Sequence, residues 1–220
     1  MTRPGVIVDV DGTMLDTNYL HTVAWARALR AHGYDDVDMA TIHAAIGIAS
    51  DGLVEYVTGG PDDAVGSTHA SEYEAFQDDV RAFPRAGDLL RACAEKGLAV
   101  VIATSGRASD LEWMLPAIGV DEDVIATATT SGDVEEAKPA PDLMEVAMTQ
   151  GDLDPARTVA LGDTVWDVEA AAKAGIPCVA VLTGGVGEAA LREAGAVEVW
   201  TSAADLLAHL GDSRIGRLAD

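Results

Sequence analysis

The sequence predicts an α/β fold in which a doubly wound, parallel-sheet, Rossmann-like core carries an inserted α-helical cap domain. Short apolar runs alternate with helical patterns through most of the chain, which is typical of a parallel sheet covered by helices. One stretch breaks this alternation, because residues 16–83 show amphipathic helical patterns and no good strand. We therefore expect residues 1–15 and 84–220 to form the core and residues 16–83 to form the cap.

The predicted core strands are short and apolar, as strands buried on both faces require. In chain order they span 6–10, 98–103, 124–126, 158–161, 178–182 and 196–200. The segments between them predict helices at 86–95, 108–117, 142–149, 168–174 and 203–209. In such folds the functional loops gather at the carboxyl ends of the strands, so we expect a site there.

The predicted cap contains three helices, at 19–31, 40–57 and 63–81. The turn Gly59-Gly60-Pro61 separates the last two, and Pro84 with Gly87 marks the return to the core. Because the insertion follows the first core strand, we expect it to close over a bound molecule and exclude water.

Composition limits the partners of the chain. Its 220 residues, 49% of them hydrophobic, are ample for one sizeable core and a smaller satellite domain. The 37 acidic against 14 basic residues give a formal net charge of -23, which repels nucleic acid and anionic membranes, so we expect neither as a partner. An anionic ligand therefore needs a local cation or metal. The acidity itself indicates solubility or a saline interior rather than an acid-specific function.

The two cysteines, Cys93 and Cys178, lie far apart and form neither a CxxC pair nor a disulfide framework, which suits a reducing compartment. The chain shows no charged-then-apolar leader and no apolar run of membrane-spanning length. We expect a cytoplasmic, soluble protein.

The most informative motif is DVDGT at residues 9–13, which directly follows the first strand. Asp9 and Asp11 are two positions apart and point the same way in an extended chain, while Gly12 permits a tight turn beside them. Two such carboxylates repel by about 4 kcal/mol at about 4 Å and an effective dielectric constant of about 20. A divalent metal beside them is therefore expected.

Two further motifs follow later strands. Thr104, Ser105 and Gly106 offer a hydroxyl and backbone N–H groups to a phosphate-like anion, although such a turn is also ordinary loop chemistry. Lys138 opens the run KPAPD and is one of only three lysines in an acidic chain. A solvated surface lysine is the alternative interpretation.

A second acidic motif, GDTVWD at residues 162–167, follows the strand at 158–161 and opens a helix. It contributes Asp163 and Asp167, of which Asp167 has the alternative role of capping that helix. The functional interpretation is favoured because an acid pair, a hydroxyl, a lysine and a second acid pair each follow their own strand, in that order.

The ordered set DVDGT, ATSG, KPAPD and GDTVWD resembles the haloacid dehalogenase-like superfamily of phosphohydrolases and phosphomutases, over nearly the whole chain. The helical insertion resembles the small cap class shared by phosphoglycolate phosphatase-like enzymes and β-phosphoglucomutase. The start of the cap, DTNYLH at residues 16–21 with Ala24 and Trp25, is especially similar to that of β-phosphoglucomutase.

The resemblance implies that Asp9 is a nucleophile that forms an aspartyl-phosphate. It implies that Asp11 is the general acid and base, which requires a pKa well above the ordinary value of about 3.9. Thr104 and Lys138 would hold the phosphoryl oxygens.

The resemblance also implies a Mg²⁺ ion, held by the carboxylates of Asp9 and Asp163 and by the main-chain carbonyl of Asp11. Asp167 would bind the ion directly or through water. Gly12 and Thr13 would shape the turn and support the site, and Ser105 and Gly106 would add donors to the substrate-binding set. Trp166 is equally a packing residue or a substrate contact.

Two cap features bear on the substrate. The resemblance places His21 near Asp11 and the cap hinge, although a polar residue on an amphipathic helix is an equal alternative. The segment 47–52, which includes Ser50, is expected to reach over the site and select the substrate. It lacks the arginine that β-phosphoglucomutase uses for a second phosphate, which favours a simple phosphatase over a mutase.

The expected function is therefore a magnesium-dependent phosphatase acting on a small phosphorylated metabolite, as a monomer or homodimer. The alternatives are a β-phosphoglucomutase-like mutase and a catalytically silent phosphometabolite-binding protein. A dehalogenase is disfavoured by Asp11 and Thr13, and a phosphonatase by the lack of any lysine in residues 16–83.

Overall fold

A six-stranded parallel sheet forms the centre of the computed structural model, which describes residues 2–134 and 138–219. The strand order is β3-β2-β1-β4-β5-β6, and every neighbouring pair is parallel. The strands are β1 (Arg3–Val8), β2 (Ala99–Ala103), β3 (Ile125–Thr129), β4 (Leu153–Gly162), β5 (Cys178–Val181) and β6 (Glu198–Trp200). This topology confirms the predicted doubly wound α/β core.

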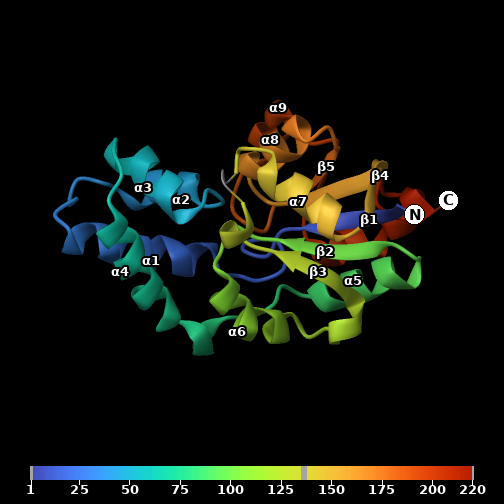
Figure 1. Cartoon of the computed structure of the whole chain (residues 1–220), viewed down its shortest axis with the longest axis horizontal. Coiled ribbons are helices and arrows are strands. Elements are labelled where there is room, and N and C mark those ends of the chain that lie inside the picture. Colours follow the sequence, from blue (N-terminus) through green and yellow to red (C-terminus); the bar gives the residue numbers. More distant parts are fainter. Residues whose placement is uncertain (1, 135–137, 220) are drawn as a thin grey trace.

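Helices cover both faces of the sheet, with α5 and α6 on one side and α7 and α8 on the other (Figure 1). Successive residues of β1 face opposite sides, so Val6 and Val8 pack with Leu89 of α5 while Ile7 packs with Leu143 of α7. These helices and the two that follow are α5 (Ala86–Glu95), α6 (Ala108–Ile118), α7 (Asp142–Gln150), α8 (Val165–Lys173), α9 (Glu188–Ala194) and α10 (Ala203–Ala208).

A second group of helices lies at one end of the molecule, away from both termini (Figure 1). It has its own hydrophobic cluster, which includes Trp25, Leu29, Ile42, Leu53 and Val65. Its helices are α1 (Asn18–Ala31), α2 (Met39–Ala45), α3 (Ser50–Thr58) and α4 (Asp63–Glu74). We call this group the cap and keep 16–83 as its proposed extent.

The predicted helix at 40–57 is wrong, because α2 ends at Ala45 and α3 begins at Ser50. Gly47, in the break, has φ of 105°, and a Cβ there would lie 2.8 Å from Thr164 Oγ1 of the core. The backbone between α2 and α3 therefore leaves the helical path where it meets the core loops. Apolar Ile46 and Ile48 continue the hydrophobic pattern through this break, which is why the pattern did not reveal it.

Smaller differences concern element ends. The helix predicted at 63–81 ends at Glu74, and β1 ends at Val8, so that Asp9 lies just beyond it. Helix α9 was not predicted.

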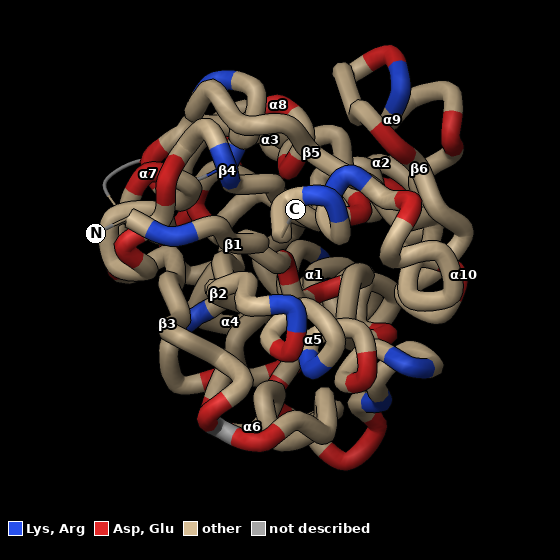
Figure 2. The backbone as a smooth tube through the Cα atoms, turned by 90° about the vertical axis from the view of Figure 1, so that its right-hand side faces the viewer, with Lys and Arg blue, Asp and Glu red and all other residues tan. Residues whose placement is uncertain are grey.

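Among the described residues, no helix combines the length and apolar character needed to cross a membrane. At the end of the molecule that carries both termini, Lys and Arg are scattered among Asp and Glu (Figure 2).

Candidate active site

Four chain segments meet beyond the carboxyl ends of the central strands. Asp9 follows β1, Thr104 follows β2, and Asp163 follows β4. Because β2 and β4 are the two neighbours of β1, the residues that follow these strands lie side by side. Lys138, which precedes α7, reaches the same place and is 1% exposed. The surface-lysine interpretation is therefore excluded.

Lys138 links the first and the last motif. Its Nζ donates to Asp9 Oδ1 at 2.7 Å and to the carbonyl oxygen of Ala103 at 3.3 Å, and it lies 2.7 Å from Asp167 Oδ1. These negative partners raise the pKa of the lysine despite the opposing effect of burial. The ammonium of Lys138 thus forms ion pairs with two buried carboxylates.

Asp9, Asp163 and Asp167 form a buried group in which one oxygen of each lies within 4.8 Å of the others. Asp163 is held by Thr13, whose hydroxyl donates at 2.7 Å, and by Asn18, whose amide donates at 2.9 Å. Asp167 also accepts from the backbone and hydroxyl of Thr164, so it caps α8 while facing Lys138. Oδ2 of Asp167 thus has the predicted capping role, and Oδ1 faces Lys138.

Electrostatics in this group favour a bound cation. Burial raises the pKa of Asp9 to about 7, against the lowering effect of Lys138 and with a further rise from Asp167 and Asp11. Burial, followed by the charges of Asp9 and Asp167, likewise raises the pKa of Asp163 well above its ordinary value. Three carboxylates beside one ammonium leave unbalanced negative charge, and hard oxygen donors suit a divalent cation. The donor set therefore fits the predicted metal.

Glycines make room around Asp163. A Cβ at Gly184 would lie 1.6 Å from Asp163 Oδ2, and one at Gly12 would lie 2.3 Å from the same atom. Gly12 has φ of 76° and accepts a hydrogen bond from the Thr183 hydroxyl at 2.6 Å. Gly12 and Thr13 line neither of the two described cavities near the site and instead support the Asp163 carboxylate.

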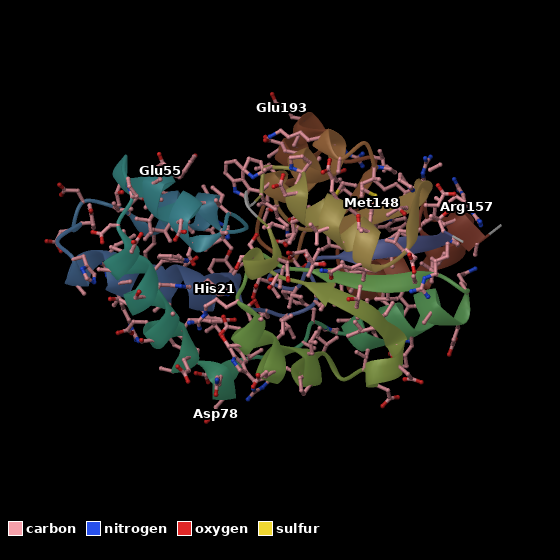
Figure 3. All side chains as sticks on the ribbon, viewed as in Figure 1. His21, Glu55, Asp78, Met148, Arg157 and Glu193 are labelled. Atoms are coloured by element: carbon pink, nitrogen blue, oxygen red, sulfur yellow. The ribbon has the colours of Figure 1, made fainter. Side chains whose placement is uncertain are left out.

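Asp11 has its side-chain partners at the start of the cap. Its Oδ1 accepts from the Thr17 hydroxyl at 2.6 Å and lies 3.1 Å from His21 Nε2. His21 lies where the cap helices meet the core (Figure 3). Its other ring nitrogen lies 3.2 Å from Nε2 of His69, and its ring stacks on Tyr73. A chain of polar groups thus runs from Asp11 into the cap.

The expected upward shift of the Asp11 pKa is wrong for this arrangement. Burial acts to raise it, but the charge of His21 and the hydrogen bonds from His21 and Thr17 hold the pKa of Asp11 below its ordinary value. The sequence-based expectation considered burial and cap closure alone. It did not include Thr17, which precedes α1, and His21 of α1 beside this carboxylate.

The Thr104 to Gly106 turn has two different functions. Thr104 Oγ1 accepts from the backbone of Gly106 at 3.0 Å, which leaves its own proton available for another acceptor. The Ser105 hydroxyl instead donates to the carbonyl oxygen of Gly47 in the cap at 2.8 Å. Trp166 Nε1 donates to the carbonyl oxygen of Ala44 at 3.0 Å, so both side chains join the cap to the core.

Two cavities open between cap and core. An inner cavity of about 80 Å³ is lined by Asp9, Asp11, His21 and the turn at Ser105 and Gly106, among others. A wider cavity of about 1150 Å³ adjoins it and includes Lys138 and Trp166. Ser50, the first residue of α3, lines both. Residues of the cap segment 47–52 thus line the same inner cavity as Asp9 and Asp11.

Several site residues were not predicted as such. Asn18 and Thr17 lie in the quoted DTNYLH motif, but their bonds to Asp163 and Asp11 required the observed fold. His69 and Tyr73 belong to α4, and no spacing relates them to the catalytic motifs. Arg107 lines both cavities and directly follows the Thr104 turn, so its proximity to that motif was the available signal.

Comparisons with known proteins agree with this geometry. The family model for haloacid dehalogenase-like hydrolases matches residues 6–181. The validoxylamine A 7'-phosphate phosphatase of Streptomyces hygroscopicus subsp. limoneus is 28% identical over 183 residues, covering 80% of this chain and 84% of that protein. The crystal structure of a hydrolase from Pseudomonas syringae is 31% identical with a TM-score of 0.89, covering 96% of this chain and 99% of that one.

A further solved structure is similar in fold at low sequence identity. The crystal structure of β-phosphoglucomutase from Clostridium difficile covers 98% of both chains with a TM-score of 0.82, at 16% identity. This likeness shows a shared fold that includes the helical cap, and it leaves the choice between hydrolase and mutase open.

The parallel sheet, the inserted cap and the buried acid group with its lysine define the class of protein as a capped α/β enzyme. The chain belongs to the haloacid dehalogenase-like hydrolase family, which confirms the predicted resemblance.

Proposed function

We propose that this chain is a magnesium-dependent phosphatase that hydrolyses a small phosphorylated metabolite through an aspartyl-phosphate. One observation carries the proposal: Asp9 and Asp11 line the same small inner cavity, while Lys138 and the remaining acids surround Asp9. The proposed nucleophile and the proposed proton-transfer group thus face one cavity of about 80 Å³. The phosphatase activity named for the Streptomyces relative supports this reaction class.

In the first step a carboxylate oxygen of Asp9 bonds to phosphorus as the bond to the leaving oxygen breaks. The Asp11–His21 pair, whose atoms lie 3.1 Å apart, holds the proton that the leaving oxygen takes up. In the second step Asp11 accepts a proton from water, the water oxygen bonds to phosphorus, and the Asp9 carboxylate departs. Orthophosphate is the product.

The other residues orient the reacting groups and balance their charge. Lys138 fixes one oxygen of Asp9 and offsets the negative charge that accumulates when a phosphate enters. Thr104 keeps a hydroxyl proton for a phosphoryl oxygen. Asp9, Asp163, Asp167 and the carbonyl oxygen of Asp11 would hold Mg²⁺, which supplies charge neutralisation at the phosphoryl oxygens when bound. A cytoplasmic location and a monomeric or homodimeric state remain predictions.

The test is release of orthophosphate from a panel of phosphorylated metabolites, with Mg²⁺ and with a chelator. We expect the wild type to release orthophosphate from at least one small ester when Mg²⁺ is present and not when it is chelated. The Asp9→Asn variant should release none. Circular dichroism of that variant checks that it remains folded. Appreciable activity of folded Asp9→Asn would refute the nucleophile.

The same panel separates the alternatives. β-Glucose 1-phosphate with a bisphosphate primer tests the mutase, which would yield glucose 6-phosphate instead of orthophosphate. A silent binding protein would leave every ester intact while its melting temperature rises with one of them.

A further inference from the structure

Asn18 is the first residue of the cap helix α1, yet its side chain contacts the acid group of the core. The residue is 3% exposed. Its Nδ2 donates to Asp163 Oδ2 at 2.9 Å and to the carbonyl oxygen of Gly184 at 3.2 Å. Because Asp163 belongs to the set of oxygens that would hold Mg²⁺, this side chain joins the cap to a proposed ligand of the metal.

The two acceptors determine which way the amide of Asn18 faces. A carboxylate and a carbonyl oxygen can only accept, so the nitrogen of the amide must be the atom that meets them. The amide oxygen, Oδ1, is thus left for a donor. It is buried and has no hydrogen-bond partner in the part of the chain that the structure describes. A buried acceptor without a donor is unfavourable, so we expect a donor there when the site is complete.

The amide of Asn18 lies in a slot between two glycines. A Cβ at Gly12 would lie 2.3 Å from Asn18 Nδ2, and a Cβ at Gly184 would lie 2.7 Å from the same atom. Either Cβ would also collide with Asp163 Oδ2, at 2.3 Å and 1.6 Å respectively. The contact between amide and carboxylate therefore requires glycine on both sides, which makes it a fitted contact and not a chance encounter of two polar groups.

The two oxygens of Asp163 have partners from different domains. Thr13 of the core donates to Oδ1 at 2.7 Å, and Asn18 of the cap donates to Oδ2. Partners of this kind orient the ligands of a metal, and their loss typically weakens metal binding about 10- to 100-fold. Mg²⁺ requires near-ideal octahedral geometry and keeps several waters. The angle of the carboxylate therefore matters, and a water is a donor of the kind that Asn18 Oδ1 lacks.

We propose that Asn18 is a positioning residue of the metal site: it holds Asp163 in the orientation that binds Mg²⁺ and so links the affinity for the cation to the position of α1. This inference rests on the proposed function, because it takes Asp163 as a ligand of Mg²⁺. Since coupling between two sites is reciprocal, a bound cation should in turn stabilise the start of the cap.

Calorimetric titration of the metal-free protein with Mg²⁺ at pH 8 tests the proposal. We expect the dissociation constant to rise about 10- to 100-fold in Asn18→Ala. Thr22→Val is the matched control, because it removes another buried hydrogen bond of α1 and leaves the bonds of Asp163 in place. It should keep the dissociation constant of the wild type. A residue with a structural role alone would lower the unfolding free energy and leave metal affinity unchanged.

An unchanged dissociation constant in Asn18→Ala, with circular dichroism showing a folded variant, would overturn the proposal. If Asn18→Ala does not fold, Asn18→Ser replaces it, since serine keeps a small polar group at this position and still lacks the amide. The same rise in the dissociation constant is expected for Asn18→Ser, and its absence would contradict the proposal in the same way.

Hydrogen exchange measures the link to the cap without any turnover. Mg²⁺ should slow exchange of the backbone amides of α1 in the wild type and in Thr22→Val. It should not slow them in Asn18→Ala, because that variant lacks the side chain that joins α1 to Asp163. Equal slowing in Asn18→Ala would refute the link.

Failure of the proposed function is recognised separately. If the wild type binds no Mg²⁺, the metal dependence of the proposed function is wrong, and this inference is wrong with it. If the wild type and Asn18→Ala bind Mg²⁺ equally well, only the inference is wrong. If the wild type binds Mg²⁺ and releases no phosphate from any ester, the phosphatase reaction is wrong, and the ratio of the two dissociation constants still decides the role of Asn18.

Discussion

The ammonium of Lys138 and the carboxylate of Asp9 are in direct contact, with Nζ 2.7 Å from Oδ1, and both groups are buried. This contact joins two motifs that are 129 positions apart in the chain. The positive charge of Lys138 therefore lies beside the carboxylate that we assign as the nucleophile. We therefore expect the stability of the fold and the proposed chemistry to depend on the same ion pair.

Lys138→Ala should destabilise the metal-free protein and abolish turnover. Removal of one partner of a buried ion pair leaves the remaining charges uncompensated, which typically costs about 3 to 5 kcal/mol of unfolding free energy. Urea unfolding measures the loss. Lys96→Ala, at an exposed position, is the control and should change stability by no more than about 0.5 kcal/mol. A loss as small as that of the control would contradict the structural role of the pair.

Mg²⁺ should raise the melting temperature, and more strongly at pH 8 than at pH 5.5. Without metal the pKa of Asp9 is about 7 and that of Asp163 is also raised, so at pH 5.5 protons occupy groups that must be ionised to bind the cation. At a Mg²⁺ concentration 100 times the dissociation constant, the stabilisation is about 2.7 kcal/mol. Thermal denaturation at both pH values provides the measurement.

For this metal prediction, Asp163→Asn should remove most of the Mg²⁺ effect, whereas Asp123→Asn, at an exposed position, should keep it. Equal stabilisation of both variants would place the cation elsewhere.

Asp11→Ala should reduce hydrolysis of alkyl phosphates much more than of aryl phosphates. An alkoxide is a poor leaving group that needs a proton, whereas a phenolate leaves without one, and general acid catalysis contributes about 10²- to 10⁴-fold. The measured quantity is kcat/KM for an alkyl phosphate and for para-nitrophenyl phosphate. Asp16→Ala, at a nearby exposed acid, controls for loss of charge. Equal losses with both substrates would remove the proton-transfer role of Asp11.

His69 should make the protein less stable as the pH falls. Burial, followed by the charges of His21 and Arg107, holds the pKa of His69 well below its ordinary value of 6.5. Below about pH 6.5 the unfolded chain binds a proton that the folded chain excludes, so this group lowers the unfolding free energy by about 1.4 kcal/mol per pH unit. The effect ends at the folded-state pKa.

His69→Phe keeps a ring against Trp25 and removes the titration. Between pH 7.5 and pH 5, its unfolding free energy should fall by about 2 kcal/mol less than that of the wild type. Urea unfolding at the two pH values tests this, and His32→Phe, at an exposed position, should behave as the wild type. A parallel loss in His69→Phe would show that His69 accepts a proton in the folded state.

The core and its acids were predictable because a parallel sheet brings the ends of its strands to one edge. Asp9, Thr104 and Asp163 follow β1, β2 and β4. Their positions directly after predicted strands were therefore enough to predict that they lie close together. Lys138 was predicted from its motif, although its burial was not evident from an isolated lysine in an acidic chain.

The contacts between cap and core were not predictable in the same way. The partners of Asp11 depend on how α1 and α4 pack against the core, and hydrophobic periodicity gives no information on such packing angles. The break at Gly47 was missed for the same reason, since the core loop that meets it is distant in sequence.

The hydrogen bonds that join the cap to the core have a kinetic consequence. Ser105 donates to Gly47, Trp166 to Ala44, and His43 to Gly184. Ser105 and Trp166 are the chain neighbours of Thr104 and Asp167, and Gly184 is the glycine that leaves space for Asp163. We expect each exchange of product for new substrate to separate these contacts and then restore them. We therefore expect turnover to be no faster than the opening and closing of the cap, whichever ester is consumed.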